Sequence, residues 1–107
     1  MPPASRRFNS RVAPHGRVWV YWECERDRDV SRVKDLSVGG LFIQTDKTKR
    51  QGDLAHLYFL VDEGQIRADA VVQHVEPHKG MGLKFDAMSE KDRPNLAALM
   101  RRLRSLT

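Results

Sequence analysis

The sequence predicts an all-β domain of about six strands, followed by one C-terminal helix. Three observations carry this prediction. Apolar and polar residues alternate strictly from Val18 to Glu25, short apolar runs recur as far as Phe85, and the spacing of apolar residues then becomes helical. Short strands at this spacing are typical of a small sandwich or barrel. At 107 residues the chain has the size of one domain, and we expect a single domain over residues 1–107.

The chain begins with a basic segment, residues 1–12. Two consecutive prolines near its start disfavour both helix and strand pairing, so we expect a flexible arm. Arg6, Arg7 and Arg11 follow, and residues 1–17 contain no acidic residue. A guanidinium group can donate paired hydrogen bonds to phosphate oxygens or to a guanine edge, and it can stack on bases. The arm is a candidate anion-binding site, although a solvated basic tail has the same composition.

The predicted strands occupy residues 17–86. The first alternates between a core face and an outer face, and the outer face carries Trp19 and Tyr21. Three interpretations of these two rings stay open, because they can cover a barrel end, stack on a base or meet a second subunit.

The later strand segments are bounded by polar or glycine-bearing turns. They lie at residues 30–36, 41–45, 54–61, 66–75 and 81–85. Residues 25–29 alternate in charge, which is typical of the solvated end of a hairpin. The run 54–61 is apolar enough to predict a strand that is covered on both faces.

The segment 89–106 predicts the C-terminal helix. Ser89 to Pro94 supplies capping residues, so the helix should begin within that stretch. Its apolar residues fall at helical spacing and are Leu96, Leu99, Met100, Leu103 and Leu106. We expect this stripe to plug or flank the barrel, while packing against a second copy or another domain is the alternative.

A second polar feature is the stretch Asp35-Leu36-Ser37-Val38-Gly39-Gly40. Its short oxygen-bearing side chains can bond nearby backbone groups, and the glycine pair permits positive φ and the close approach of another molecule. These properties suit a polar ligand. They are also the properties of any tight turn between strands.

Two motifs together resemble the PilZ domain family. Arg7-Phe8-Asn9-Ser10-Arg11 is similar to its RxxxR motif, and Asp35 to Gly40 is similar to its [D/N]xSxxG motif. Gly82-Leu83-Lys84-Phe85 and the helix after it resemble the later part of the family pattern, so the resemblance covers nearly the whole chain. The resemblance implies a six-stranded antiparallel β-barrel of the split-barrel type. It also implies binding of the bacterial second messenger cyclic di-GMP and action on a separate protein partner.

The resemblance further implies roles for the motif residues. The two RxxxR arginines would grip the phosphates and the Hoogsteen edges of guanine, the Asp and Ser would bond a base or ribose-phosphate edge, and the glycines would leave room. Arg6 is expected to stack on an outer base and to favour an intercalated pair of ligand molecules. Binding is expected to order the arm and so change the surface that a partner reads. The candidate ligand-binding residues are Arg6, Arg7, Arg11, Asp35, Ser37, Gly39 and Gly40.

Composition limits the partners and the compartment. The formal charge of +5 and the pI near 9.8 favour anionic partners. Cys24 is the only cysteine, which rules out an internal disulfide and favours a reducing compartment. Because the sequence has neither a secretory signal pattern nor an apolar run long enough to span a bilayer, we expect a cytoplasmic protein.

Catalysis is not expected. The four histidines form no HExxH pattern, and CxxC, GxSxG and P-loop patterns do not occur, so we expect neither a metal nor a cofactor. Two alternatives to a nucleotide receptor remain. One is a PilZ-fold adaptor that recognises a protein without nucleotide, although such family members lack the RxxxR motif. The other is a small basic barrel that binds single-stranded nucleic acid through Trp19, Tyr21 and arginines. A homodimer is also possible.

Overall fold

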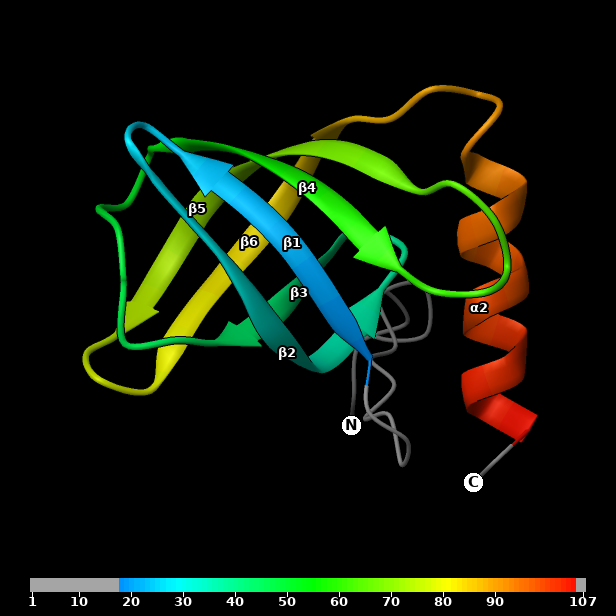
Figure 1. Cartoon of the computed structure of the whole chain (residues 1–107), viewed down its shortest axis with the longest axis horizontal. Helices are drawn as coiled ribbons and strands as arrows, with labels where there is room; N and C mark the ends of the chain where they lie inside the picture. Colours follow the sequence, from blue (N-terminus) through cyan, green and yellow to red (C-terminus); the bar gives the residue numbers. More distant parts are fainter. Residues whose placement is uncertain (1–17, 106–107) are drawn as a thin grey trace, which may run out of the picture.

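The computed structural model describes residues 18–105 of the chain. Six antiparallel strands close into a barrel in the order β1-β2-β3-β6-β5-β4, and helix α2 follows them (Figure 1). The elements are β1 (Trp19–Cys24), β2 (Asp27–Ser37), β3 (Gly40–Gln44), β4 (Leu54–Leu60), β5 (Arg67–Glu76), β6 (Gly80–Ala87) and α2 (Arg93–Ser105). The predicted six-stranded antiparallel barrel with a C-terminal helix is confirmed. The expected basic arm, with Arg6, Arg7 and Arg11, and Leu106 at the other end lie outside the described residues.

The core fills the barrel with the inward rows of all six strands. In β1 every second residue is buried, and Trp22 is fully enclosed. Its indole Nε1 donates a 2.8 Å hydrogen bond to Oγ of Ser31, so the one polar atom of this large side chain is satisfied inside the core. The alternation predicted for the first strand therefore holds, and Trp19 lies on the outer surface.

Strand β2 is longer than predicted. The hairpin end expected at residues 25–29 contracts to a turn at Glu25 and Arg26, where Glu25 has a φ of 56°. Between Val33 and Asp35 the register with β3 shifts, so that Lys34 is an extra residue in β2. Without this bulge, alternation from Val33 would point Asp35 into the core. The bulge leaves Asp35 half-buried at the outer surface.

Strand β4 differs from its prediction in the exposure of its outer face. The expectation that residues 54–61 are covered on both faces is wrong, because β4 alternates. Ala55, Leu57 and Phe59 are buried, whereas the outward side chains are exposed. These exposed side chains are Leu54, His56, Tyr58 and Leu60.

Helix α2 stands at one end of the barrel (Figure 1). It begins within the predicted stretch, and its apolar stripe belongs to the same buried cluster as the inward rows of the strands. The buried residues of the stripe are Leu96, Leu99, Met100 and Leu103. The prediction that the stripe packs on the barrel is confirmed. Within residues 18–105, no helix combines the length and apolar character that a membrane span requires.

Candidate functional site

The motif from Asp35 to Gly40 forms the junction of β2 and β3. Asp35 and Ser37 belong to β2, Gly40 begins β3, and only Val38 and Gly39 leave the sheet, so the turn is shorter than the motif. Ser37 is buried. Its Oγ accepts a hydrogen bond from the Gly39 backbone N–H (3.2 Å) and donates one to the Gly40 carbonyl oxygen (3.3 Å). The serine hydroxyl thus holds the turn in its shape.

Gly40 is required by packing between strands. A Cβ atom at this position would lie 2.1 Å from the carbonyl oxygen of Leu83 on the adjacent strand β6. The described glycines with positive φ are Gly52 and Gly64, so neither Gly39 nor Gly40 uses that freedom. The glycine at position 40 therefore keeps β3 and β6 close together, and the neighbouring Gly39 is exposed at the tip of the turn.

Two of the hollows that adjoin this turn lie on the outer surface of β2, β3, β5 and β6. We call this surface the polar face. The first hollow has a volume of about 260 Å³ and is lined by Ser37, Gly39, Gly40, Gln73, His74, Gly82, Leu83 and Lys84. The second has a volume of about 250 Å³ and is lined by Lys34, Asp35, Phe42, His74 and Glu76. His74 lines both hollows, so all four described candidate residues, Asp35, Ser37, Gly39 and Gly40, border one continuous surface.

The ring of His74 is held between two neighbours. Its centroid lies 5.8 Å from that of Phe42, and a Cβ on Gly82 would lie only 2.3 Å from His74 Cε1. Gly82 therefore gives the imidazole the space to lie against β6. On the other side, Nζ of Lys34 lies 5.9 Å from the centroid of the Phe42 ring. The polar face thus combines cations with flat rings, which suits a ligand with both phosphates and bases.

Eight residues of the polar face were missed by sequence reasoning. They are Lys34, Phe42, Gln73, His74, Glu76, Gly82, Leu83 and Lys84. Three of them lie on β5, far along the chain from the motif, and only the barrel closure brings them next to it. A glycine in the interior of a strand was the available signal, because it often marks the close approach of another group.

The chain enters β1 at the same end of the barrel as the motif. The Val33 backbone N–H donates to the carbonyl oxygen of Val18 (2.8 Å), and Asp35 follows Val33 by two positions along β2. Arg11 precedes Val18 by seven positions, and seven residues can span at most roughly 24 Å. The RxxxR arginines themselves lie outside the described residues.

A separate group of potential metal ligands comprises Cys24, Glu25 and Asp53, whose ligand atoms lie within 4.8 Å of one another. Burial raises the pKa of the Cys24 thiol, and the neighbouring Asp53 and Glu25 carboxylates raise it further. The Cys24 thiol therefore stays protonated at neutral pH in the metal-free protein. Groups of this size with exposed acidic members are common without a metal, so we assign no metal site to it.

Comparison with known proteins gives a family and a fold. A family model of the PilZ domain matches residues 5–102. No curated protein matches the chain. Among solved structures, the chain is similar to the inhibitor of motility (MotI/DgrA) of Bacillus subtilis, with 22% identity and a TM-score of 0.71 over 95% of this chain. The match covers 56% of that protein, so this chain spans little more than half of its length. At this identity the likeness shows a common fold.

Proposed function

We propose that this chain, which belongs to the PilZ domain family, binds cyclic di-GMP on its polar face and passes the signal to a protein partner. The family comprises cyclic di-GMP receptors and adaptors, which bind and regulate rather than catalyse. In this proposal the motif arginines at positions 7 and 11 close over the nucleotide, and the changed surface is what the partner recognises.

One observation supports the proposal above the others. The turn from Asp35 to Gly40 borders hollows at the end of the barrel where β1 starts, so the chain that carries the arginines enters the barrel beside the motif. A short tether raises the effective concentration of the arginines at the site, and ligand binding then converts that tether into a clamp.

The chemistry of the polar face suits the ligand. A guanine base presents N–H groups that can donate hydrogen bonds to the Asp35 carboxylate, and the ligand's two phosphates require cations. Lys34 and Lys84 line the two hollows and supply positive charge beside the motif. Arg7 and Arg11 would supply the paired hydrogen bonds to phosphate and guanine that lysine cannot make.

Isothermal titration calorimetry with cyclic di-GMP tests this function directly. We expect saturable binding to the full chain, and we expect Arg7→Ala and Arg11→Ala each to weaken it by about tenfold to a hundredfold, because each removes a charged contact worth about 1–3 kcal/mol. Arg101→Ala is the matched control, since Arg101 is exposed on α2. Absence of binding heat, or an unchanged Kd in both motif variants, would refute the proposal.

The same titration distinguishes the number of ligands. If Arg6 stacks on an outer base, two nucleotides bind per chain and Arg6→Ala reduces the stoichiometry to one. A stoichiometry of one in the unmodified chain contradicts the intercalated pair.

An oligothymidylate titrated in parallel tests the nucleic-acid alternative. In that case the affinity for the oligothymidylate would fall steeply with salt as counterions are released.

A further inference from the structure

Large apolar side chains gather on a second surface of the barrel, away from both hollows. They project outward from β4, β1 and β2, which lie side by side in the closed sheet (Figure 1). The exposed fraction is 38% for Trp19, 43% for Tyr58, 44% for Val30 and 53% for Leu60, and Tyr21 is partly buried. We call this surface the aromatic face, and it comprises Trp19, Tyr21, Val30, Tyr58 and Leu60.

The strand register makes these side chains one continuous patch. In one row Trp19 lies directly opposite Leu60 of β4, and in the next row Tyr21 lies between Tyr58 of β4 and Val30 of β2. Side chains opposite each other on adjacent antiparallel strands have Cβ atoms about 4.5–5.5 Å apart, so the five are in mutual reach. Contiguous exposed apolar surface of this kind marks interaction sites in soluble domains.

Arginines surround the patch. Arg32 lies opposite Trp19 on β2, and Arg67 lies opposite Tyr58 on β5. Among the described residues Arg32 forms no ion pair, whereas Arg67 pairs with Asp92 (3.4 Å). Aromatic side chains flanked by arginine are the composition that is enriched at protein interfaces.

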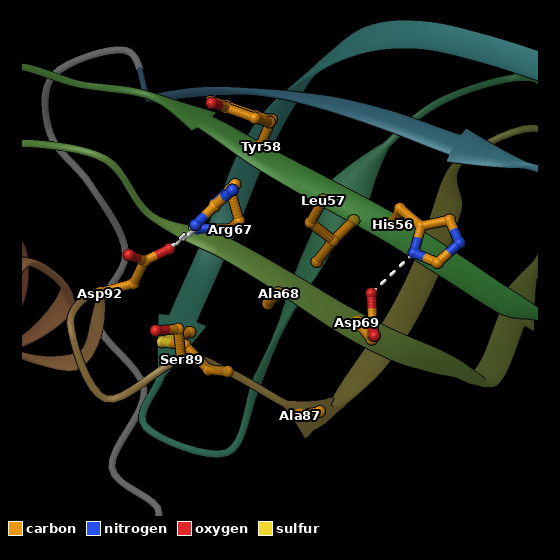
Figure 2. A pocket seen from close by; sticks show the side chains of 10 residues that line it. His56, Leu57, Tyr58, Arg67, Ala68, Asp69, Ala87, Ser89 and Asp92 are labelled. Carbon is orange, nitrogen blue, oxygen red and sulfur yellow. Dashed lines mark hydrogen bonds and ion pairs between the residues drawn. The ribbon is translucent and has the colours of Figure 1, made fainter.

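A hollow of about 530 Å³ lies at the β5 side of the aromatic face (Figure 2). Its lining includes the apolar residues Leu57, Ala68, Ala87 and Met88. Figure 2 shows the Arg67 side chain beside Tyr58 and joined to Asp92. The Asp92 carboxylate is almost fully buried and accepts from both the backbone N–H (2.9 Å) and Nε of Arg67, while half of the Arg67 side chain stays exposed. Asp92 therefore orients a guanidinium at the rim of this hollow, whose lining also includes the pair of His56 with Asp69 (2.6 Å).

We propose that the aromatic face is the docking surface for an acidic protein segment. An apolar side chain of that segment enters the hollow, and its carboxylates pair with Arg32 and Arg67. The proposal rests on the proposed function only in that a PilZ domain acts on a partner. It goes beyond that function because it assigns the partner a surface and a chemistry.

Charge and shape favour this occupant over two others. A second copy of this chain would bring its own Arg32 and Arg67 towards the same arginines, and like charges oppose such a pairing. Single-stranded nucleic acid would gain stacking on the rings but not on Val30 or Leu60.

A random-peptide display library selected on the immobilised full chain is the test. We expect enriched peptides to combine Asp or Glu with a large apolar residue. A synthetic enriched peptide should bind at least about tenfold more weakly to Leu60→Glu and to Arg32→Glu, because hot-spot contacts are worth more than about 1.4 kcal/mol. The control is Leu54→Glu, since Leu54 is 48% exposed on the same side of β4 but lies beyond the rows paired with β1.

Other outcomes would overturn the proposal. These are a failure to enrich peptides, enrichment without acidic residues, or binding that Leu60→Glu leaves unchanged. A dimer in sedimentation that Leu60→Glu abolishes would assign the face to a second copy, and oligothymidylate binding that Trp19→Ala abolishes would assign it to nucleic acid. Cyclic di-GMP titrations of Leu60→Glu separate the two proposals, because we expect its nucleotide affinity and circular dichroism to equal those of the unmodified chain.

Discussion

The two outer faces of this barrel differ in shape and in chemistry, although both are built from antiparallel strands. The polar face has two adjoining hollows, a half-buried carboxylate and lysines near flat rings. The aromatic face presents large apolar side chains in register, and its hollow lies at the edge. Concave surfaces with a few placed polar groups suit small ligands, whereas broad apolar surfaces with arginine suit proteins. This contrast is the reason that we propose one face for the nucleotide and the other for the partner.

Strand β2 belongs to both faces, and its bulge divides them. Val30 and Arg32 lie on the aromatic side of the bulge, while Asp35 lies on the polar side. Only the Val33-Lys34 step separates Arg32 from Asp35 along the chain. A bulge bends and twists its strand locally, so a ligand that presses on Asp35 acts close to the first arginine of the docking surface. This is a short route by which binding on one face can affect the other.

The largest expected effect tests whether the apolar residues of β4 serve folding or recognition. Leu57→Ala should lower the free energy of unfolding by about 2–5 kcal/mol, because Leu57 is fully buried in the core. Leu60→Ala, three residues further along the same strand, should change it by less than about 0.5 kcal/mol. Urea denaturation measures both values. Equal losses of unfolding free energy in the two variants would mean that Leu60 is a core residue and that the aromatic face is not a separate surface.

The second effect concerns the turn that borders the polar face. Gly40→Ala should destabilise the fold by about 1–3 kcal/mol, since the added methyl group would overlap the Leu83 carbonyl oxygen. The same change should weaken cyclic di-GMP binding, because β3 must shift. Val38→Ala is the matched control within the turn, as Val38 is exposed. A Gly40→Ala protein with unchanged stability and affinity would show that the close β3–β6 contact is not needed.

A third experiment exchanges one carboxylate on each face for an amide. Asp35→Asn should weaken cyclic di-GMP binding by about tenfold, because a charged acceptor becomes neutral. Asp69→Asn should leave the affinity unchanged, since Asp69 lines the hollow beside the aromatic face, where it pairs with His56 (2.6 Å). Titration calorimetry gives both Kd values. If the Asp69 variant binds nucleotide as weakly as the Asp35 variant, the ligand does not distinguish the faces as proposed.

Periodicity predicted the number of strands and the helix because burial of one side of each element is a local property of the sequence. Periodicity failed for β4, where the apolar run predicts burial on both faces. Leu54 and Leu60 are as apolar as Leu57, so hydrophobicity alone could not show that they point outward. The bulge at Lys34 was equally invisible, since register depends on the partner strand.

The candidate site was predictable only where it is contiguous in the chain. Asp35, Ser37 and the glycines form one recognisable stretch, whereas His74 reaches the site from β5 through barrel closure. Residue type also misled in detail. The hydroxyl of Ser37 forms hydrogen bonds within the turn, and Gly40 is required by its close packing against β6. Local structure therefore explains why these two residues are present without a ligand. Their roles in binding stay predictions.

The smallest expected effect is the pH dependence that Asp92 contributes. Its hydrogen bond from the Arg67 backbone N–H holds the pKa of the Asp92 carboxyl below its usual value in the folded chain. A carboxyl whose folded pKa lies below its unfolded value of about 3.9 favours the folded state above that pH, and this contribution is lost as the pH falls through the folded pKa. Asp92→Asn should therefore be less stable at neutral pH and decline less steeply below about pH 4. Urea denaturation at neutral and acidic pH tests this, and an equal dependence of stability on pH in both proteins would contradict it.

Because Asp92 also orients Arg67, the variant should bind an acidic peptide more weakly at neutral pH while its cyclic di-GMP affinity stays unchanged.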